Sequence, residues 1–470
     1  MATQRVRSFD PHKVSKPGLC SPRPFVYTKP ANNLAKIQVI FVTILLYLYV
    51  NKRNIDDTEP DKEADKLKDK TAHREDRGES TNLMEPLVLS GNSRHRPALN
   101  DLAIELATAS VGLRRSLPEG VVTALADLVR AMNCYYSNLI EGHDTHPIDI
   151  ERALKKDYST NPEQRNLQLE AEAHVTVQKW IDDRGLTGRA TTTEAILEIH
   201  RRFCERLPDE LLVVEHPTTK EKLPVVPGEL RRHEVEVGRH VPVSPGALPR
   251  FLARFEDVYS KLGKSETILA TAAAHHRLAW IHPFLDGNGR VIRLMSYATL
   301  LDTVDTGGVW SIARGLARDV ETYKQHLANC DQPRRNDLDG RGNLSEEALA
   351  EFTRFFLETC LDQVRFMEAL VQPEKLHTRI KLWIDEEIAL GSLHEKSGLI
   401  LQAILYRGEL PRGDAAELIG SSSRTASRVV SGLIDHDVVT SETSKAPLRI
   451  HFPAALAPRW MPGLFPEQRG

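Results

Sequence analysis

The chain has 470 residues, of which 41% are hydrophobic and 27% charged, the composition of a globular protein with room for two or three domains. Its formal net charge of -3 excludes a dedicated nucleic-acid coat and a polybasic membrane binder. The 5 cysteines are odd in number and form no CxxC pair, which argues against a disulfide scaffold and a cysteine zinc site and favours a reducing compartment.

Residues 1–83 differ in composition from the rest of the chain. An uncharged apolar run, IQVIFVTILLYLYV, spans residues 37–50. It is shorter than the roughly 20 residues of a membrane-spanning helix, and no small-residue cleavage site follows it. Two interpretations stay open, an uncleaved membrane anchor and a leader with no part in the fold. Residues 51–82 mix charges of both signs with few apolar residues, which predicts a solvated, disordered linker.

The folded part begins near residue 97 and is mostly helical, because apolar residues recur there at spacings of three and four. This periodicity predicts helices over residues 98–117, 119–141, 148–154, 166–183 and 191–207, and again from 248 to about 370 with a polar loop at 331–343. Residues 223–249 are rich in β-branched residues, Pro and Gly, and predict a small hairpin.

The C-terminal part has a different layout. Residues 371–390 predict a helical connector, and residues 391–458 predict a winged helix-turn-helix. The candidate recognition helix, SSSRTASRVVSGLI, presents Arg424, Thr425 and Arg428. DNA binding requires a basic face, but nearby acidic residues nearly balance these arginines. Protein contacts or dimerisation are therefore the alternative to DNA.

Residues 281–293, IHPFLDGNGRVIR, concentrate the chemistry of the chain. His282 can accept a proton near neutral pH, and Asp286 can hold a hard cation such as Mg²⁺ through oxygen. Each residue also has a structural interpretation, His282 as a packed side chain and Asp286 as a turn or N-cap residue.

The second half of this segment has the features of an anion site. Gly287, Asn288 and Gly289 permit unusual backbone angles directly before an apolar helical run, and backbone N–H groups at a helix start bind phosphate. Asn288 can add a side-chain donor. Arg290 and Arg293 lie one helical turn apart and suit a polyphosphate. Together with the preceding residues they predict a magnesium–nucleotide triphosphate site with a base at its mouth.

The segment resembles the signature of the Fic (Fido) family, HxFx[DE]GNGRxxR, at every fixed position. The resemblance continues upstream through AAHHRLAWI, which includes His275, and through residues 227–252, which resemble the family's substrate-docking flap. It covers residues 97–370. The fold class that it implies is mostly α, an all-helical Fic core with a small β-hairpin flap, to which the C-terminal winged helix-turn-helix is added.

The resemblance implies a protein adenylyltransferase that transfers AMP from ATP to a Ser, Thr or Tyr hydroxyl of a target protein. His282 would be the general base, and Asp286 would hold Mg²⁺ between the α- and β-phosphates. The glycines and Asn288 would bind phosphate, and Arg290 and Arg293 would hold the β- and γ-phosphates. This is chemistry of positioning and charge stabilisation.

Two further positions follow from the same resemblance. Tyr323 falls where relatives place an aromatic residue near the nucleotide, although a core tyrosine is an equal alternative. Residues Val237–His240 are the expected edge of the flap, along which a target segment would align as an added strand.

The segment SNLIEG, residues 137–142, resembles the inhibitory motif [ST]xxxE[GN] of self-inhibited Fic proteins through Ser137, Glu141 and Gly142. In the class with an upstream inhibitory helix, Glu141 would pair with Arg293 and occupy the space of the γ-phosphate. An ordinary helix end is the structural alternative. Two other functions stay open, removal of AMP by the same site and a winged-helix regulator whose Fic domain senses nucleotide.

The expected partners follow from these interpretations. They are ATP, an unidentified target protein, and a second copy of the chain, since oligomerisation is one way to release the inhibition. DNA would bind through the C-terminal part and a membrane through residues 37–50. The need for ATP favours a cytoplasmic location.

Overall fold

The structure, a computed structural model, describes residues 75–216 and 220–466. The apolar run at 37–50, most of the predicted linker and Cys20 lie outside the described residues. Within the described ranges, no helix has both the length and the apolar character needed to cross a membrane.

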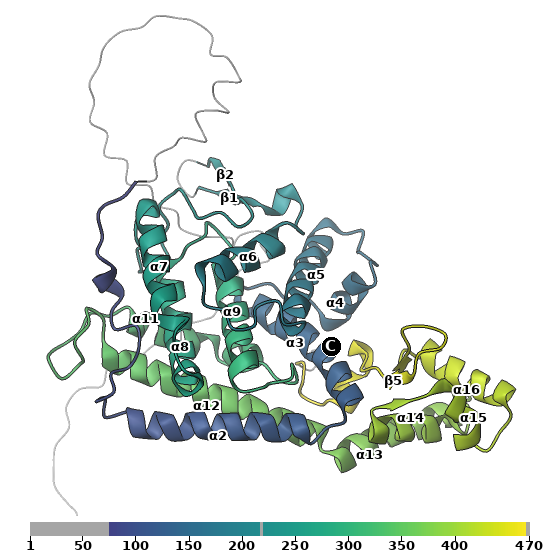
Figure 1. Ribbon diagram of the computed structural model, residues 1–470. Helices are drawn as coiled ribbons and strands as arrows, with labels where there is room; N and C mark the ends of the chain where they lie inside the picture. The colour runs from purple at the N-terminus through teal and green to yellow at the C-terminus, as the bar shows by residue number, and fades with distance from the viewer. Residues whose placement is uncertain (1–74, 217–219, 467–470) are drawn as a thin grey trace, which may run out of the picture. The chain divides into compact units, whose positions relative to one another are not determined.

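The protein is mostly α-helical, as predicted (Figure 1). The helices of its larger part are α2 (Arg96–Arg115), α3 (Glu119–Ile140), α4 (Pro147–Leu154), α5 (Pro162–Asp182), α6 (Thr193–Cys204), α7 (Leu248–Tyr259), α8 (Lys264–Ile281), α9 (Asn288–Thr303), α10 (Ala313–Arg318), α11 (Val320–Cys330), α12 (Glu346–Val371) and α13 (Pro373–Ala389). Short 3-10 turns precede α2 at Thr81–Met84 and lie at Asp209–Leu211 and Pro245–Ala247.

The helical pair α8 and α9 lies at the centre of this part. Both helices are buried on almost every face, as expected for helices that are apolar all round. The chain reverses between them over only six residues. His282 ends α8 in the left-handed conformation, with φ 49° and ψ 66°, and Gly287 begins α9 with φ 79°. The loop that carries the motif is therefore fixed at both ends by the core.

Helix α3 belongs to the larger part and also contacts the C-terminal module, residues 391–466. At its start, Gly120 approaches Gly408 so closely that an added Cβ would collide with the Gly408 carbonyl. Near its end, the Tyr136 hydroxyl donates to the Leu464 carbonyl oxygen at 3.0 Å. Most residues of α3 are buried as a result.

The C-terminal module combines short helices with a small sheet. Its helices are α14 (Ser397–Arg407), α15 (Ala415–Leu418), α16 (Ser423–Asp435) and α17 (Ala457–Trp460), with 3-10 turns at Arg412–Asp414 and Ala454–Leu456. The strands β3 (Glu409–Leu410), β4 (Val439–Thr440) and β5 (Leu448–Ile450) pair antiparallel in the order β3-β5-β4. The small sheet therefore joins β3, which follows α14, to the pair formed by β4 and β5.

The predicted hairpin at 223–249 is displaced toward the N-terminus. The observed hairpin pairs β1 (Val213–Glu215) with β2 (Lys222–Pro224). Beyond it the chain is irregular except for one bridge, in which Val237 and His240 bond to each other at 2.9 and 3.0 Å. The backbone N–H and C=O groups of Val237 and His240 are paired with each other across a tight turn at Gly238, and the alignment of a target strand along Val237–His240 stays a prediction.

The predicted linker at 51–82 is also wrong where the structure describes it. Residues 75–80 have no regular secondary structure, Thr81–Met84 form a 3-10 turn, and Met84 is fully buried. The charged side chains that predicted a solvated segment instead form ion pairs and hydrogen bonds with the folded part. Asp76 binds Arg250, and Glu79 accepts hydrogen bonds from Ser244. Composition alone cannot separate a disordered charged segment from one that is held by ion pairs.

Candidate active site

The loop between α8 and α9 is held by its own side chains. The Asn288 side-chain Oδ1 accepts from the Phe284 N–H at 3.0 Å, and its Nδ2 donates to the Phe284 carbonyl at 2.8 Å. Phe284 is fully buried and stacks on the His200 ring, with centroids 3.9 Å apart. The amide of Asn288 therefore shapes the loop with its Oδ1 and one of its two N–H groups, and a phosphate contact by the second N–H stays a prediction. Backbone N–H groups are the donors that the start of α9 can offer an anion.

His282 is half-buried at the mouth of this loop. Burial lowers the pKa of His282 to about 3, and the charges of Arg231 and His240 act in the same direction. The imidazole is therefore neutral at physiological pH and able to accept a proton. Its backbone carbonyl accepts a hydrogen bond from Arg231 Nε at 2.8 Å, which fixes the residue from the main-chain side.

Asp286 is the carboxylate of the loop. Its Oδ1 accepts from the Gly287 N–H at 2.7 Å. Burial raises the pKa of Asp286 above its usual range, although the Arg290 charge opposes this. A single carboxylate of this kind suits Mg²⁺, which is commonly bound by one or two carboxylates together with substrate phosphates. In the part of the chain that the structure describes, no cluster of three or more His, Cys, Asp or Glu could hold a metal ion by itself.

Arg293 is almost completely buried and already has an anionic partner. Its Nη2 donates to Glu141 Oε1 at 2.5 Å, while Nε donates to the Ser137 hydroxyl at 2.9 Å. Burial alone would raise the pKa of Glu141, but Arg293 and Arg290 outweigh it and hold that pKa below its ordinary value. The carboxylate is therefore ionised and lies at the N-terminus of α9, where an anion is favoured.

Two glycines frame this carboxylate. An added Cβ at Gly289 would collide with Glu141 Oε1, so the carboxylate rests directly on the start of α9. Gly142 follows the end of α3 with φ 88°, a left-handed conformation that favours glycine. The side chain of Glu141 is still 35% exposed, so it occupies the open side of the site.

Arg290 is bound by residues that the sequence did not predict. Its Nη2 donates to Glu170 Oε2 at 2.8 Å and lies 3.2 Å from His143 Nδ1. His143 also contacts Glu170 at 2.8 Å, and this hydrogen bond raises the pKa of His143. The sequence gave only a weak indication of this role for Glu170, because the buried face of α5 carries several polar residues. They are Gln168, Glu170, His174 and Gln178.

Tyr323 is a core residue. It is only 5% exposed, and its hydroxyl lies 2.7 Å from His275 Nε2, whose other ring nitrogen contacts the Ser296 hydroxyl. Burial raises the pKa of Tyr323 to about 12. The structure favours the core alternative over an adenine-lining role, because this side chain supports α8 and α9 from inside.

The folded loop thus places a neutral histidine beside two buried arginines that are paired with carboxylates. Residues 190–300 match the model of the Fic/DOC family, and the chain therefore carries a Fic/DOC domain. This range includes His282, Asp286 and both arginines, whereas Glu141 and Glu170 precede it.

Known proteins with similar sequences carry the same family name. A protein of Drosophila willistoni named "Protein adenylyltransferase Fic" is 30% identical over 205 residues, which are 42% of this chain and 38% of the relative. The protein of that name from Drosophila yakuba is 38% identical over 112 residues, 23% of this chain and 20% of the relative. The chain thus matches well under two thirds of the length of these relatives.

Solved structures of Fic proteins are also similar. A Fic family protein from Desulfovibrio desulfuricans aligns with a TM-score of 0.41 and 16% identity, over 74% of this chain and 95% of that one.

Proposed function

We propose that this protein is an adenylyltransferase that transfers AMP from ATP to a hydroxyl side chain of a target protein. The observation that carries the proposal is the complete motif folded as a base-plus-anion site, with a neutral His282 beside the N-terminus of α9 and its two arginines. The printed names of the similar Drosophila proteins support the same activity.

The reaction follows from these groups. His282 takes the proton of the target hydroxyl, and the resulting oxygen forms a bond to the α-phosphorus of ATP. The bond between the α-phosphorus and the bridging oxygen breaks, AMP stays on the target, and pyrophosphate leaves. Arg290 and Arg293 bind the phosphates that become pyrophosphate, so they stabilise the charge that accumulates there.

Asp286 is the residue that would hold Mg²⁺ in this reaction. The Gly287 N–H donates to its carboxylate and fixes the orientation of the side chain. When bound, the ion would neutralise phosphate charge and orient the polyphosphate.

The contact between Glu141 and Arg293 supports self-inhibition of this activity. Glu141 holds the guanidinium that the γ-phosphate would need, and Ser137 bonds to the same guanidinium from α3. We expect ATP to bind in an unproductive pose until this carboxylate leaves. The same glutamate could also position water for the removal of AMP, which is the alternative direction at this site.

The test is intact mass spectrometry of three purified forms after incubation with Mg²⁺ and ATP: the unmodified chain, Glu141→Gly, and Glu141→Gly with His282→Ala. We expect the mass gain of one AMP in Glu141→Gly alone. A gain in the double variant would contradict His282 as the base. No gain in any form, together with no ATP binding by calorimetry, would overturn the proposal.

A second candidate function is DNA binding by the C-terminal module as a winged helix. It is favoured by one observation: Arg424 and Arg428 on α16 are exposed and form no ion pair within the described residues. A homodimer, membrane contact through residues 37–50 and a cytoplasmic location stay predictions.

A further inference from the structure

The central part of the flap, residues 231–244, has no strand in a regular sheet. Its two limbs meet in a β-bridge between Val237 and His240 at the tip. The limbs are also joined by Arg231, which is 3% exposed and donates to the His233 carbonyl at 3.0 Å and to the Val243 carbonyl at 2.5 Å. A single buried guanidinium therefore takes the place of a strand ladder.

The same guanidinium reaches the catalytic loop. Arg231 Nε donates to the His282 carbonyl at 2.8 Å, and the Arg231 backbone N–H donates to the Pro283 carbonyl at 2.9 Å. His282 is a non-glycine residue in the left-handed region, a conformation that persists only where its surroundings enforce it. The flap thus contributes to fixing the backbone of the proposed base.

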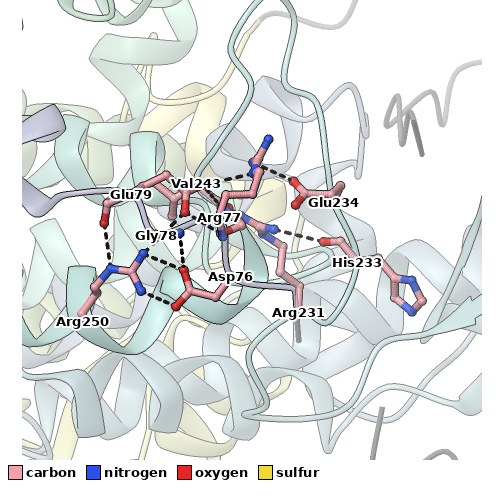
Figure 2. Close-up of polar contacts among 10 residues, drawn as sticks. Asp76, Arg77, Gly78, Glu79, Arg231, His233, Glu234, Val243 and Arg250 are labelled. Atoms are coloured by element: carbon pink, nitrogen blue, oxygen red, sulfur yellow. Dashed lines mark hydrogen bonds and ion pairs between the residues drawn. The ribbon is translucent and has the colours of Figure 1, made fainter. Parts of the chain in front are cut away.

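A third segment holds the flap from outside (Figure 2). We call residues 75–79 the strap. The Glu79 carboxylate accepts from the Ser244 N–H at 2.8 Å and from the Ser244 hydroxyl at 2.6 Å, and Ser244 is fully buried. On the other limb, Arg77 Nη2 forms an ion pair with Glu234 at 3.2 Å. The strap therefore contacts both limbs of the flap, next to the residues that Arg231 joins.

The strap is itself anchored to α7. Arg250 makes a two-pronged ion pair with Asp76, at 2.5 and 2.7 Å, and its Nε donates to the Glu79 carbonyl at 2.8 Å. The Gly246 N–H donates to the Glu75 carbonyl at 2.7 Å. Charge-assisted and bidentate contacts of this kind fix geometry more strongly than neutral hydrogen bonds.

We infer that the strap is a positioning element of the active site, which acts through Arg231 to hold the His282 backbone in its left-handed conformation. Glu79 and Arg231 are its positioning residues, and neither contacts the reacting atoms. Loss of Glu79 loosens the Ser244 limb, Arg231 loses its fixed carbonyl partners, and the His282 carbonyl is released. The imidazole then samples orientations that do not reach the acceptor hydroxyl, whereas the phosphate site on α9 is unaffected.

The test compares Glu79→Ala with Glu85→Ala in the full chain carrying Glu141→Gly. Glu85 is a matched control, since it lies further along the same N-terminal segment and pairs with an α7 arginine, Arg254, at 2.7 Å, whereas its carboxylate does not hold the flap as that of Glu79 does. We expect Glu79→Ala to lower the rate of AMP transfer by about tenfold or more with an unchanged Kd for ATP, because misplacing a catalytic group by 1 Å can cost about a hundredfold. Glu85→Ala should keep the parent rate.

Hydrogen–deuterium exchange gives a readout that does not need activity. We expect faster exchange at residues 231–244 and 282–285 in Glu79→Ala, measured without Glu141→Gly, and no such change in Glu85→Ala. Ser244→Ala serves as the second variant if Glu79→Ala fails to fold. Unchanged exchange at 282–285 in a folded variant would overturn the inference.

The measurement of the AMP-transfer rate rests on the proposed function, whereas the hydrogen–deuterium exchange experiment does not. If the Glu141→Gly parent neither transfers AMP nor binds ATP, the proposed function fails, and the exchange result still decides whether the strap positions His282.

Discussion

Two helices of the molecule begin with a pair of arginines, but one pair is buried and the other is exposed. On α9, Arg290 and Arg293 follow a glycine-rich turn, are 6% and 4% exposed, and contact Glu170 and Glu141. On α16, Arg424 and Arg428 follow a serine-rich turn, are exposed, and form no ion pair in the described part of the chain. Both patterns attract anions, but only the first is already occupied by carboxylates of the protein itself.

This difference shows that the sequence of an arginine pair at a helix start does not indicate whether the pair is free to bind a ligand or is already paired within the protein. Glu141 is 152 residues from Arg293 in the sequence, and Glu170 is 120 residues from Arg290. Only the fold brings them together. A site that holds its own anions must exchange them for the ligand, whereas an exposed pair must only release solvent and counterions.

The sharpest test of this contrast is stability. Arg290→Ala removes the guanidinium from the buried Glu170 and leaves it with His143 alone, so we expect the free energy of unfolding to fall by about 3–5 kcal/mol. Arg424→Ala removes an exposed side chain and should change it by less than about 0.5 kcal/mol. Urea denaturation followed by tryptophan fluorescence measures both. Equal changes in the two variants would refute the contrast.

Lowering the pH should reduce the free energy of unfolding. The contribution of each buried histidine should be smaller than the effect of Arg290→Ala. Burial lowers the pKa of His282 to about 3 and that of His200 to about 4, below the ordinary value near 6.5. The unfolded chain therefore binds these protons first. The free energy of unfolding should be highest above pH 6.5 and decline as the pH falls toward the folded values, by at most about 1.4 kcal/mol per pH unit for each histidine.

Urea denaturation at pH 7.5, 6.5 and 5.5 measures this decline. A His200→Gln variant removes one of the titrating groups and should show a shallower dependence on pH. Constant stability across this range would mean that the buried histidines do not titrate as the structure implies.

The smallest expected effect concerns the exposed pair. If the C-terminal module binds DNA, Arg424→Ala with Arg428→Ala should weaken binding uniformly across sequences and reduce the slope of log affinity against log salt by about 2. Fluorescence anisotropy with a labelled random duplex at several salt concentrations gives this slope, and Arg290→Ala is the control that should leave it unchanged. An unchanged slope in the double variant would assign this face to another partner.

Local patterns accounted for the helices and for the loop. Helices α2, α3 and α5 follow from apolar residues at spacings of three and four, and the loop residues from His282 to Arg293 are contiguous, so their chemistry could be predicted together. The two bonds of Asn288 to Phe284 could not be predicted, since nothing in the motif distinguishes an amide that binds a ligand from one that folds its own turn.

Long-range contacts account for what the sequence did not reveal. Arg231 is one arginine in a charged stretch, and its partner His282 lies 51 residues further along. The flap was predicted as strands because β-branched residues dominate it, yet Pro242 and Pro245 lack the N–H that a ladder requires. The strap looked like a linker because ion pairs between distant segments leave no periodicity in the sequence.

The packing of α3 determines how Glu141 can leave the site. This helix is enclosed on nearly all sides, with Gly120 against Gly408 at one end and Tyr136 bonded to Leu464 near the other. It cannot swing away as a rigid rod without opening two modules. The Glu141 carboxylate can leave Arg293 by a change of its own rotamer or by unwinding of the last turn before Gly142, so the release of this ion pair is a local event at a helix tip that breaks a few hydrogen bonds.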